Sequence, residues 1–259
     1  MNYGMMISAS GALTSMYRQQ VLTNNLANLN TAGFKLDIPM VRQRDVVRVE
    51  DSLMSLPSNA MLERLGAGVM LMPTRVSMAQ GTLKVTGRPF DLALQGRGFF
   101  AVSQRGEDGQ EQIRLTRDGR FARNAQGRLV QAATGLEVLD ERDRPIDVPG
   151  RGSFTVNDEG WVFAGNERIA RLQITDVPDL SVLRKLGANL FAVPQAALNA
   201  RTTAPATVRQ NHIEQSTVNE ISALMAVTSA SRAVSSNIGM ITYHDRMMDR
   251  AINSLGRVA

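Results

Sequence analysis

Few side chains of this 259-residue chain could bind a metal or act as a nucleophile, because it contains two histidines and no cysteine. His244 lies beside Asp245, and Asp249 follows one helical turn later. A pair on a helix at such spacing could contact a metal ion, but a zinc site needs three or four protein ligands. Since the pattern supplies no further donor, we interpret these residues as a solvated helix face and predict no metal site.

A glycine pattern in the middle of the chain has the spacing of a nucleotide-binding fingerprint. Gly96, Gly98 and Ala101 spell G-x-G-x-x-A, which in dinucleotide-binding proteins lets a pyrophosphate approach the backbone at the start of a helix. Here Phe99 and Phe100 continue as a strand, so the helix dipole and the free amides are missing. We predict a tight turn at this position and no cofactor.

No pattern in the chain indicates a catalytic nucleophile. No serine lies in a nucleophile elbow. Asp108, Asp118 and Asp158 lie in predicted turns, where aspartate commonly accepts hydrogen bonds from its own backbone. The absence of cysteine removes disulfides, thiolate metal sites and cysteine nucleophiles together. We therefore predict that the protein is not an enzyme, although the alternative of a site assembled from distant residues stays open.

Charge and hydropathy argue against two classes of partner. The formal net charge is +5, but basic residues are interleaved with acids and form neither a run nor a stripe on a helix, so we predict no nucleic-acid binding. No uninterrupted apolar stretch approaches the length of a membrane span. The N-terminus lacks the basic start, the apolar stretch and the cleavage site of a secretory signal peptide. We expect neither membrane insertion nor a cleaved signal peptide.

The elements that would position any site are dominated by two helices, one at each end of the chain. The first is predicted from about residue 2 to residue 28, where Asn28, Asn30 and Gly33 provide the turn chemistry that ends a helix. Among residues 1–30, Arg18 is the one charged residue, and apolar residues fall on more than one helical face. Such a helix must be enclosed by protein or lipid.

The C-terminal helix carries a regular apolar row. Alternating steps of three and four residues pass through Leu224, Val227, Ser231, Val234, Ile238, Ile241, Asp245, Met248, Ile252 and Leu255. Eight of these ten positions are apolar, which is typical of a coiled-coil seam. A helix over residues 218–255 would be roughly 60 Å long, too long for a compact domain of this size to bury. Part of it must therefore face another molecule. Thr217 and Glu220 have the spacing of a capping box at its start.

Between the helices, residues 82–178 have the period of two and the frequent turns of an antiparallel β domain of about ten short strands. Residues 36–81 are predicted as an extended or irregular linker with an exposed loop, and residues 179–215 as a short helix and an extended return segment. Residues 1–35 and 216–259 hold the helices. The predicted class is α+β, in which long terminal helices pack as a coiled-coil-like pair around an inserted antiparallel β domain.

Several sequence blocks resemble the bacterial flagellar basal-body rod and hook protein family. The strongest block reproduces the family's order almost without gaps in Asn24, Asn25, Leu26, Ala27, Asn28, Leu29, Asn30, Thr31, Ala32, Gly33, Phe34 and Lys35. Further similar blocks lie at residues 80–83, 86–100, 116–121, 127–130 and 186–191. Within the family, residues 138–149 are more similar to the proximal rod type than to the distal rod type.

This resemblance implies a structural subunit of the flagellar rod. Such a subunit is exported through the flagellar type III apparatus and polymerises through its terminal helices into the periplasmic shaft that transmits torque to hook and filament. Its implied partners are copies of itself, other rod, hook and basal-body proteins, and the export apparatus. The implied assembly contacts are Leu13, Met16, Leu26, Leu224, Val227, Val234, Ile238, Ile241, Met248 and Ile252. The implied motif and turn residues are Asn24, Asn25, Leu26, Ala27, Asn28, Gly33 and Phe34.

Two other functions stay open from the residues alone. In the first, the helices of an adaptor or regulatory protein pair with one defined partner, which gives a closed complex instead of a filament. In the second, the β domain carries an enzyme site, which predicts a concave pocket with convergent titratable groups. The mass of the complex at rising concentration tests the first alternative, and the lining of any pocket tests the second.

Overall fold

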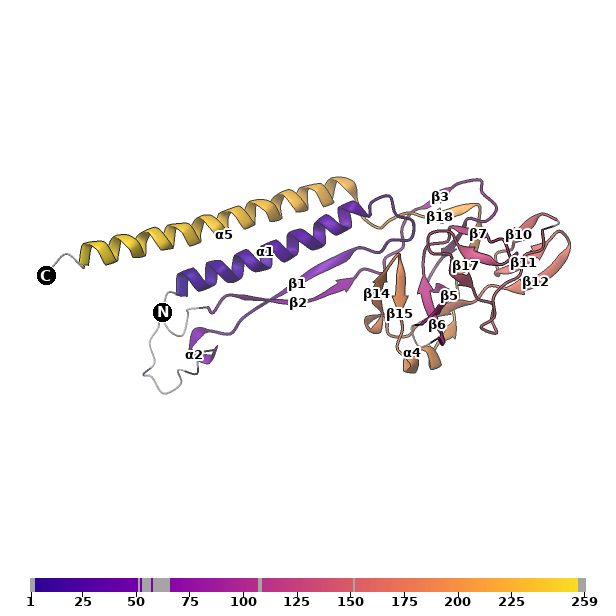
Figure 1. Cartoon of the computed structure of the whole chain (residues 1–259), viewed down its shortest axis with the longest axis horizontal. Coiled ribbons are helices and arrows are strands. Elements are labelled where there is room, and N and C mark those ends of the chain that lie inside the picture. The colour runs from indigo at the N-terminus through magenta and orange to yellow at the C-terminus, as the bar shows by residue number, and fades with distance from the viewer. Residues whose placement is uncertain are drawn as a thin grey trace. The chain divides into compact units, whose positions relative to one another are not determined.

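The computed structural model describes residues 3–50, 52, 57, 66–106, 109–150 and 152–255. These residues form two compact units, each assembled from segments that are distant in sequence. The helical unit comprises the described residues within 1–27, 37–77 and 219–259, and the β unit comprises those within 28–36 and 78–218. Figure 1 shows the elements of both units.

The helical unit consists of two long helices, one short helix and a small sheet. Its elements are α1 (Tyr3–Ala27), β1 (Asp37–Gln43), α2 (Val47–Glu50), β2 (Val69–Val76) and α5 (Glu220–Leu255). Helix α1 packs along its length against α5 (Figure 1), so the predicted α+β class with paired terminal helices is confirmed. Among the described helices, none is long and apolar enough to cross a membrane.

Small residues on α1 allow the two helices to approach closely. A Cβ atom on Gly4 would lie 2.6 Å from Cε1 of His244, and one on Gly11 would lie 2.8 Å from Oδ1 of Asn237. Asn237 Nδ2 also donates to Ser15 Oγ at 3.4 Å. Since low residue numbers in α1 contact high numbers in α5, the helices run antiparallel. The contacts recur after seven residues on both helices, as in a coiled coil.

On α5 the buried and half-buried side chains form one row, which we call the α1-facing row. Its members are Ala223, Ala226, Val227, Ala230, Val234, Asn237, Ile241 and His244, and every other described side chain of α5 is exposed. The predicted seam shares Val227, Val234 and Ile241 with this row. Four other seam positions, Leu224, Ser231, Ile238 and Asp245, lie one residue to the side of this row. The close approach of α1 admits small side chains such as Ala223 and Ala230 more easily than leucine or isoleucine.

Strands β1 and β2 form a two-stranded antiparallel sheet, in which Met40 lies opposite Met72 and Val41 opposite Leu71. The prediction of an extended or irregular linker over residues 36–81 did not include this pairing. The two strands are joined by a long connection, so no short turn signals that they pair. The exposed loop predicted near residues 50–59 lies largely outside the described residues.

The β unit is built from short antiparallel strands. They are β3 (Leu83–Val85), β4 (Leu92–Gln95), β5 (Phe99–Arg105), β6 (Glu111–Thr116), β7 (Phe121–Arg123), β8 (Leu129–Gln131), β9 (Glu137–Val138), β10 (Phe154–Val156), β11 (Trp161–Ala164), β12 (Glu167–Arg171), β13 (Ile174–Asp176), β14 (Arg184–Gly187), β15 (Leu190–Ala192), β16 (Thr202–Thr203), β17 (Thr207–Gln210) and β18 (His212–Glu214). A 3-10 helix, η2 (Leu180–Val182), and a helix, α4 (Gln195–Asn199), lie among them.

These strands form four sheets within the described part of the β unit. The largest has nine strands: the path β14-β15-β6-β5-β9-β8-β7, with β13 pairing to β5 and β16 to β13. The smaller sheets are β10-β11-β12, β4-β17 and β3-β18. One buried apolar cluster draws residues from most of these strands, including Leu92, Phe100 and Leu129, which are all 0% exposed. Each such side chain contributes roughly 1.5–3 kcal/mol on burial, so the β unit has a core of its own.

The β unit extends beyond the predicted limits of residues 82 and 178. Strands β15 and β17 pair with β6 and β4, so residues after 178 complete the sheets. The short helix predicted around residues 179–189 is limited to η2, and a β14-β15 hairpin follows. Ala188 and Asn189 adopt positive φ values of 48° and 59°, the geometry of a two-residue hairpin turn. The chain therefore reverses here as a pair of strands and not as a helix.

The start of α5 differs from the predicted capping box. Asn219 Oδ1 accepts a hydrogen bond from the Ser222 N–H at 3.1 Å, so Asn219 caps the helix. Thr217 Oγ1 instead accepts from the Leu36 N–H at 3.0 Å within the β unit. The capping box prediction is therefore wrong, because tertiary contacts engage the threonine and a better cap lies two residues later.

Candidate assembly surface

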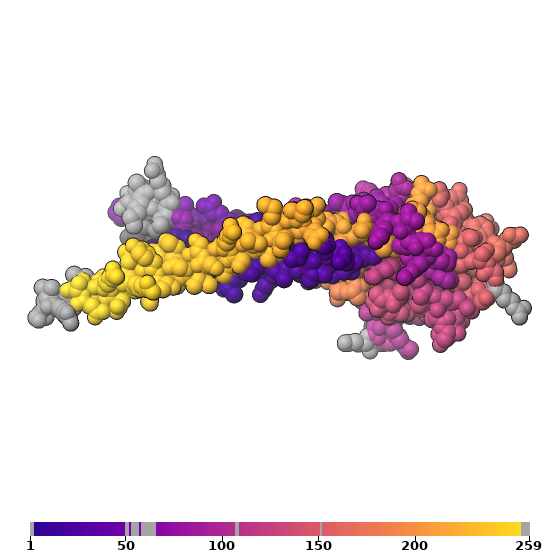
Figure 2. Space-filling view, turned by 90° about the horizontal axis from the view of Figure 1, so that it is seen from above, coloured from indigo at the N-terminus to yellow at the C-terminus, as the bar shows by residue number. Residues whose placement is uncertain are grey.

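The C-terminal end of α5 lacks a covering element in the part of the chain that the structure describes. Every side chain over residues 245–254 is exposed, although Met248 and Ile252 continue the α1-facing row at helical spacing. Gly4, in the first turn of α1, already lies against His244, so α5 continues past the end of α1 (Figures 1 and 2). We call residues 245–255 the overhang, which is about 16 Å long at 1.5 Å per residue.

Exposed apolar side chains are spread over the whole helical unit. Those between 36% and 72% exposed are Met6, Leu13 and Met16 on α1, Ile38 and Val41 on β1, Val49 on α2, Met70, Leu71 and Met72 on β2, and Ile221, Leu224, Met225, Ile238, Met240, Tyr243, Met247, Met248 and Ile252 on α5. In the described β unit the comparable residues are Val85 and Leu186. Extended apolar surface of this kind marks an interaction site.

The predicted contact residues divide into two sets. Val227, Val234 and Ile241 are half-buried in the α1-facing row, and Leu26 is also half-buried. The exposed set consists of Leu13, Met16, Leu224, Ile238, Met248 and Ile252. Val227, Val234 and Ile241 therefore belong to the contact of the helix pair within one chain, whereas the exposed set is available to another molecule.

Asn25, in the Asn24–Lys35 motif, joins the last turn of α1 to the sheet of the helical unit. Its Nδ2 donates to the Asp37 carbonyl at 2.7 Å, and its Oδ1 accepts from the Asp37 N–H at 2.9 Å. The side chain is 4% exposed. By contrast Asn24, Ala27 and half-buried Asn28 are more accessible. Asn25 thus pairs with a strand residue as another strand would, which fixes where β1 starts relative to α1.

The rest of the motif belongs to the β unit, where Gly33 makes its closest approach. Gly33 has φ +69°, and a Cβ atom there would lie 2.4 Å from the carbonyl carbon of Arg117. Its N–H donates to the Glu214 carbonyl at 2.7 Å. Phe34 is 6% exposed, with Lys185 Nζ 4.2 Å from its ring centroid. Glycine is needed here because the backbone has a positive φ and because there is no space for a Cβ atom.

A buried carboxylate holds three segments of the β unit together. Glu214 Oε1 accepts from Lys35 Nζ at 2.5 Å and from the Gly81 N–H at 2.8 Å, and Oε2 accepts from Arg117 at 3.1 Å. Lys35 Nζ also donates to the Ala79 carbonyl at 2.6 Å. Lys35 comes shortly after α1 in the chain, and Glu214 shortly before α5. This cluster therefore joins the points where the chain enters and leaves the β unit.

The Lys35–Glu214–Arg117 cluster is stable only as a complete set. The side chains of Lys35 and Glu214 are each 1% exposed and that of Arg117 is 6% exposed. Burial lowers the pKa of Lys35 in spite of the neighbouring carboxylate, and burial lowers the pKa of Arg117 in the same way. Two cations share this anion, so removal of Glu214 would leave the buried charge of Lys35 without an ionic partner and Arg117 with only the carboxylate of Asp176 near it.

Sequence reasoning missed this cluster. Lys35 and Arg117 lie in family-like blocks, which was the available signal, but Lys35 and Glu214 are 179 positions apart. A spacing of that size carries no periodic pattern. Only the antiparallel pairing of β18 with β3 and the loop at Gly33 bring these charges together.

Among the described residues, the histidines and glycines singled out from the sequence do not form a site, and Asp108 lies outside the described residues. His244 packs over Gly4, while His212 Nδ1 contacts the Gln210 carbonyl at 2.7 Å. Gly96 and Gly98, with φ +111° and +126°, form the tight turn between β4 and β5. Nowhere in the described part of the chain do three histidines or carboxylates lie close enough together to hold a metal ion.

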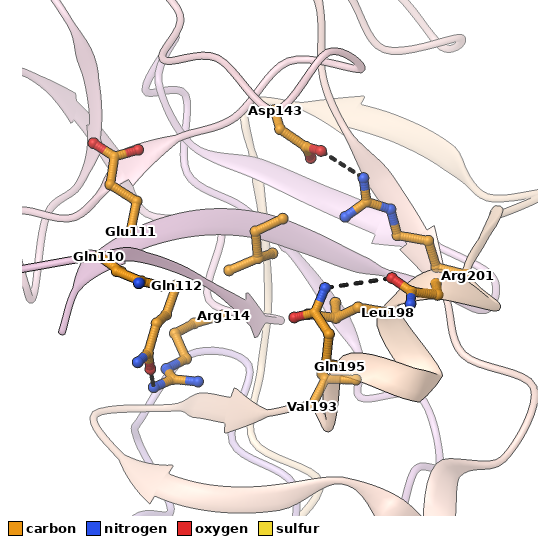
Figure 3. Close-up of a pocket in the computed structure, with 11 residues that line it drawn as sticks. Gln110, Glu111, Gln112, Arg114, Asp143, Val193, Gln195, Leu198 and Arg201 are labelled. Atoms are coloured by element: carbon orange, nitrogen blue, oxygen red, sulfur yellow. Dashed lines mark hydrogen bonds and ion pairs between the residues drawn. The ribbon is translucent and has the colours of Figure 1, made fainter. Parts of the chain in front are cut away.

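A concave pocket of about 600 Å³ lies on the β unit beside β6 and α4 (Figure 3). Three of its four charged side chains are engaged with other side chains. Arg201 donates to Asp143 at 2.6 Å, and Arg114 donates to Gln104 at 2.8 Å. Glu111 lies apart from the Arg201–Asp143 pair (Figure 3). This lining lacks the convergent acid and base that the enzyme alternative predicts.

Comparisons with known proteins give a consistent family. Residues 6–35 match the model of the flagella basal body rod protein, and residues 93–164 match that of the flagellar hook protein FlgE/F/G D1 domain. The chain is 31% identical to the flagellar basal-body rod protein FlgF of Caulobacter vibrioides, over 100% of both chains. It is 30% identical to FlgG of Buchnera aphidicola, over 94% of this chain and 96% of that one. A flagellar hook-basal body complex protein of Bacillus subtilis, FlhO, is 25% identical over 98% of this chain and 99% of its own length.

Proposed function

Because this chain belongs to the family of flagellar basal-body rod proteins, we propose that it is a non-catalytic subunit that polymerises through its terminal helices into the periplasmic rod. The rod transmits torque to hook and filament. The subunit is exported by the flagellar type III apparatus without a cleaved signal peptide. It contacts copies of itself and other rod, hook and basal-body proteins, and it neither binds nucleic acid nor inserts into the membrane.

The observation that carries this proposal is the overhang of α5. Its row continues past the end of α1 through Met248 and Ile252, and every described side chain over residues 245–254 is exposed. A row that is covered at one end and open at the other can be completed by a second molecule. When each molecule completes the row of the next, the contact is heterologous and repeats without closing, as a filament requires.

A charge placed on the overhang tests the proposal. Burial of an isoleucine side chain contributes roughly 1.5–3 kcal/mol, so Ile252→Glu should weaken association between purified chains by roughly 10- to 150-fold. Sedimentation of the full-length chain over a range of concentrations measures this loss. Ile252 is 71% exposed, so the substitution should leave the fold of one chain unchanged.

The matched control is Ser254→Glu, which introduces the same charge on another side of the helix. Ser254 is also exposed, and this variant should associate as the unchanged chain does. Equal association of all three proteins would contradict an assembly role for the overhang. The unchanged chain should also give species whose mass rises with concentration. A single complex of fixed mass would instead favour the adaptor or regulatory alternative.

A further inference from the structure

The methionines of this chain are segregated by unit. All fourteen lie outside residues 79–224, so Met78 is the one methionine of the β unit. The chain has no cysteine. Its sulfur chemistry is therefore that of thioethers, and nearly all of these thioethers belong to the helical unit that carries the exposed apolar surface.

Two of these thioethers lie on the overhang itself. Met247 is 50% exposed and Met248 is 36% exposed, and Met248 continues the α1-facing row. Other exposed methionines of α5 lie outside the overhang, such as Met225 at 68% and Met240 at 47%. An accessible methionine is a site of oxidation to the sulfoxide, which turns a flexible apolar side chain into a polar one.

We propose that Met247 and Met248 are sites of reversible oxidation by peroxide, and that their oxidation blocks assembly of the subunit. This inference rests on the proposed function, since it requires the overhang to be an assembly contact. In the reaction a peroxide oxygen forms the S–O bond while the O–O bond breaks. The thioether is oxidised, and the peroxide is reduced to water, or to an alcohol if it is organic.

Oxidation should block assembly because it makes an apolar side chain of the overhang polar, and a polar side chain is unfavourable in a buried contact. A thioether packs into irregular apolar gaps without needing a hydrogen bond. A sulfoxide oxygen is a strong acceptor, and its burial without a donor is unfavourable. The next member of the row after Met248 is Ile252, which donates no hydrogen bond, and His244, one turn before Met248, already lies against Gly4 of α1. In the assembled rod the same sulfur atoms are covered, so free subunits are the sensitive form.

The experiment treats purified full-length chain with hydrogen peroxide, maps sulfoxides by mass spectrometry, and measures association by sedimentation. Both Met247 and Met248 should be oxidised, and association should fall by about tenfold or more, as expected for polar groups in an apolar contact. The double variant Met247→Leu/Met248→Leu conserves volume and cannot be oxidised. It should associate after the same treatment.

The matched control is Met225→Leu/Met240→Leu, which removes two exposed thioethers from the same helix but keeps those of the overhang. After peroxide it should lose association as the unchanged chain does. Methionine sulfoxide reductases A and B should restore association of the unchanged chain, which tests reversal without any substitution. The inference is overturned if the treated chain associates normally, if neither overhang methionine is oxidised, or if the Met247→Leu/Met248→Leu variant is equally sensitive. Failure of the proposed function is distinct, because untreated chain would then not associate.

Discussion

At the scale of single residues, Glu214 stabilises the place where the chain enters and leaves the β unit. Its carboxylate accepts from Lys35, Arg117 and the Gly81 N–H, so one anion compensates two buried cations. Exposed ion pairs elsewhere in the β unit have no such importance, because water solvates either partner when the other is lost. Glu214 is therefore important for stability because its loss would leave buried cations without their carboxylate.

Replacement of Glu214 by glutamine should lower the free energy of unfolding by roughly 3–5 kcal/mol, as for other buried pairs that lose one partner. Glu141→Gln is the control, because Glu141 is 43% exposed and pairs with Arg171 at 2.8 Å; its effect should stay within about 1 kcal/mol. Urea unfolding followed by fluorescence of Trp161, the one tryptophan of the chain, measures both. Equal effects at the two sites would show that the cluster does not stabilise the β unit.

At the scale of elements, the helix pair depends on small residues that face the partner helix. Gly11 lies against Asn237, whereas a Cβ on Gly239 of α5 would meet nothing within 4 Å. Glycine within a helix is unfavourable relative to alanine by roughly 0.5–1 kcal/mol. Helix preference therefore does not explain a glycine at Gly11. The close approach of α5, which leaves no room for a Cβ atom, does.

The two glycines should respond oppositely to alanine. Gly239→Ala should stabilise α5 by roughly 0.5–1 kcal/mol, because only the helix preference changes. Gly11→Ala should destabilise the pair, because its Cβ would lie 2.8 Å from Asn237 Oδ1. Thermal unfolding followed by circular dichroism at 222 nm compares the variants. A gain of stability for Gly11→Ala would mean that Asn237 moves aside easily and that the helices are not closely packed there.

At the scale of the whole molecule, the buried core and most of the exposed apolar surface belong to different units. The β unit has its own buried core, while most of the exposed large apolar side chains and nearly all methionines belong to the helical unit. The α+β fold with paired terminal helices thus combines one unit that buries most of its large apolar side chains with another that leaves many of them exposed. This division supports the proposed function, in which the helices associate and the β unit folds independently.

A shortened chain tests this division. Lys35 Nζ contacts the Ala79 carbonyl, so a brief glycine-serine linker can join residues 28–36 directly to residues 78–218. This protein should unfold cooperatively by Trp161 fluorescence and stay monomeric at concentrations where the full chain associates, because Val85 and Leu186 are its large exposed apolar residues among those described. Concentration-dependent association of the shortened chain would place an assembly surface on the β unit.

Much of this organisation could be predicted because its causes are local. Alternating apolar residues such as Leu92 and Leu94 indicate strands, and a row with steps of three and four indicates α5. The contact set was harder to predict. Whether Leu224 or Ala223 faces α1 depends on how a helix distant in the sequence packs against α5, and the threonine expected to cap α5 is engaged by Leu36 instead.

By itself, the sequence determined that this protein has two apolar terminal helices, an inserted β domain and no recognisable catalytic or metal-binding pattern. Periodicity, turn chemistry and composition act over a few residues, so they can be seen without the fold. Only the tertiary structure decided that Lys35, Arg117 and Glu214 share one buried site. It alone also showed that α5 continues beyond α1 and leaves Met248 and Ile252 exposed. Those features depend on which distant segments meet and on where a partner helix ends.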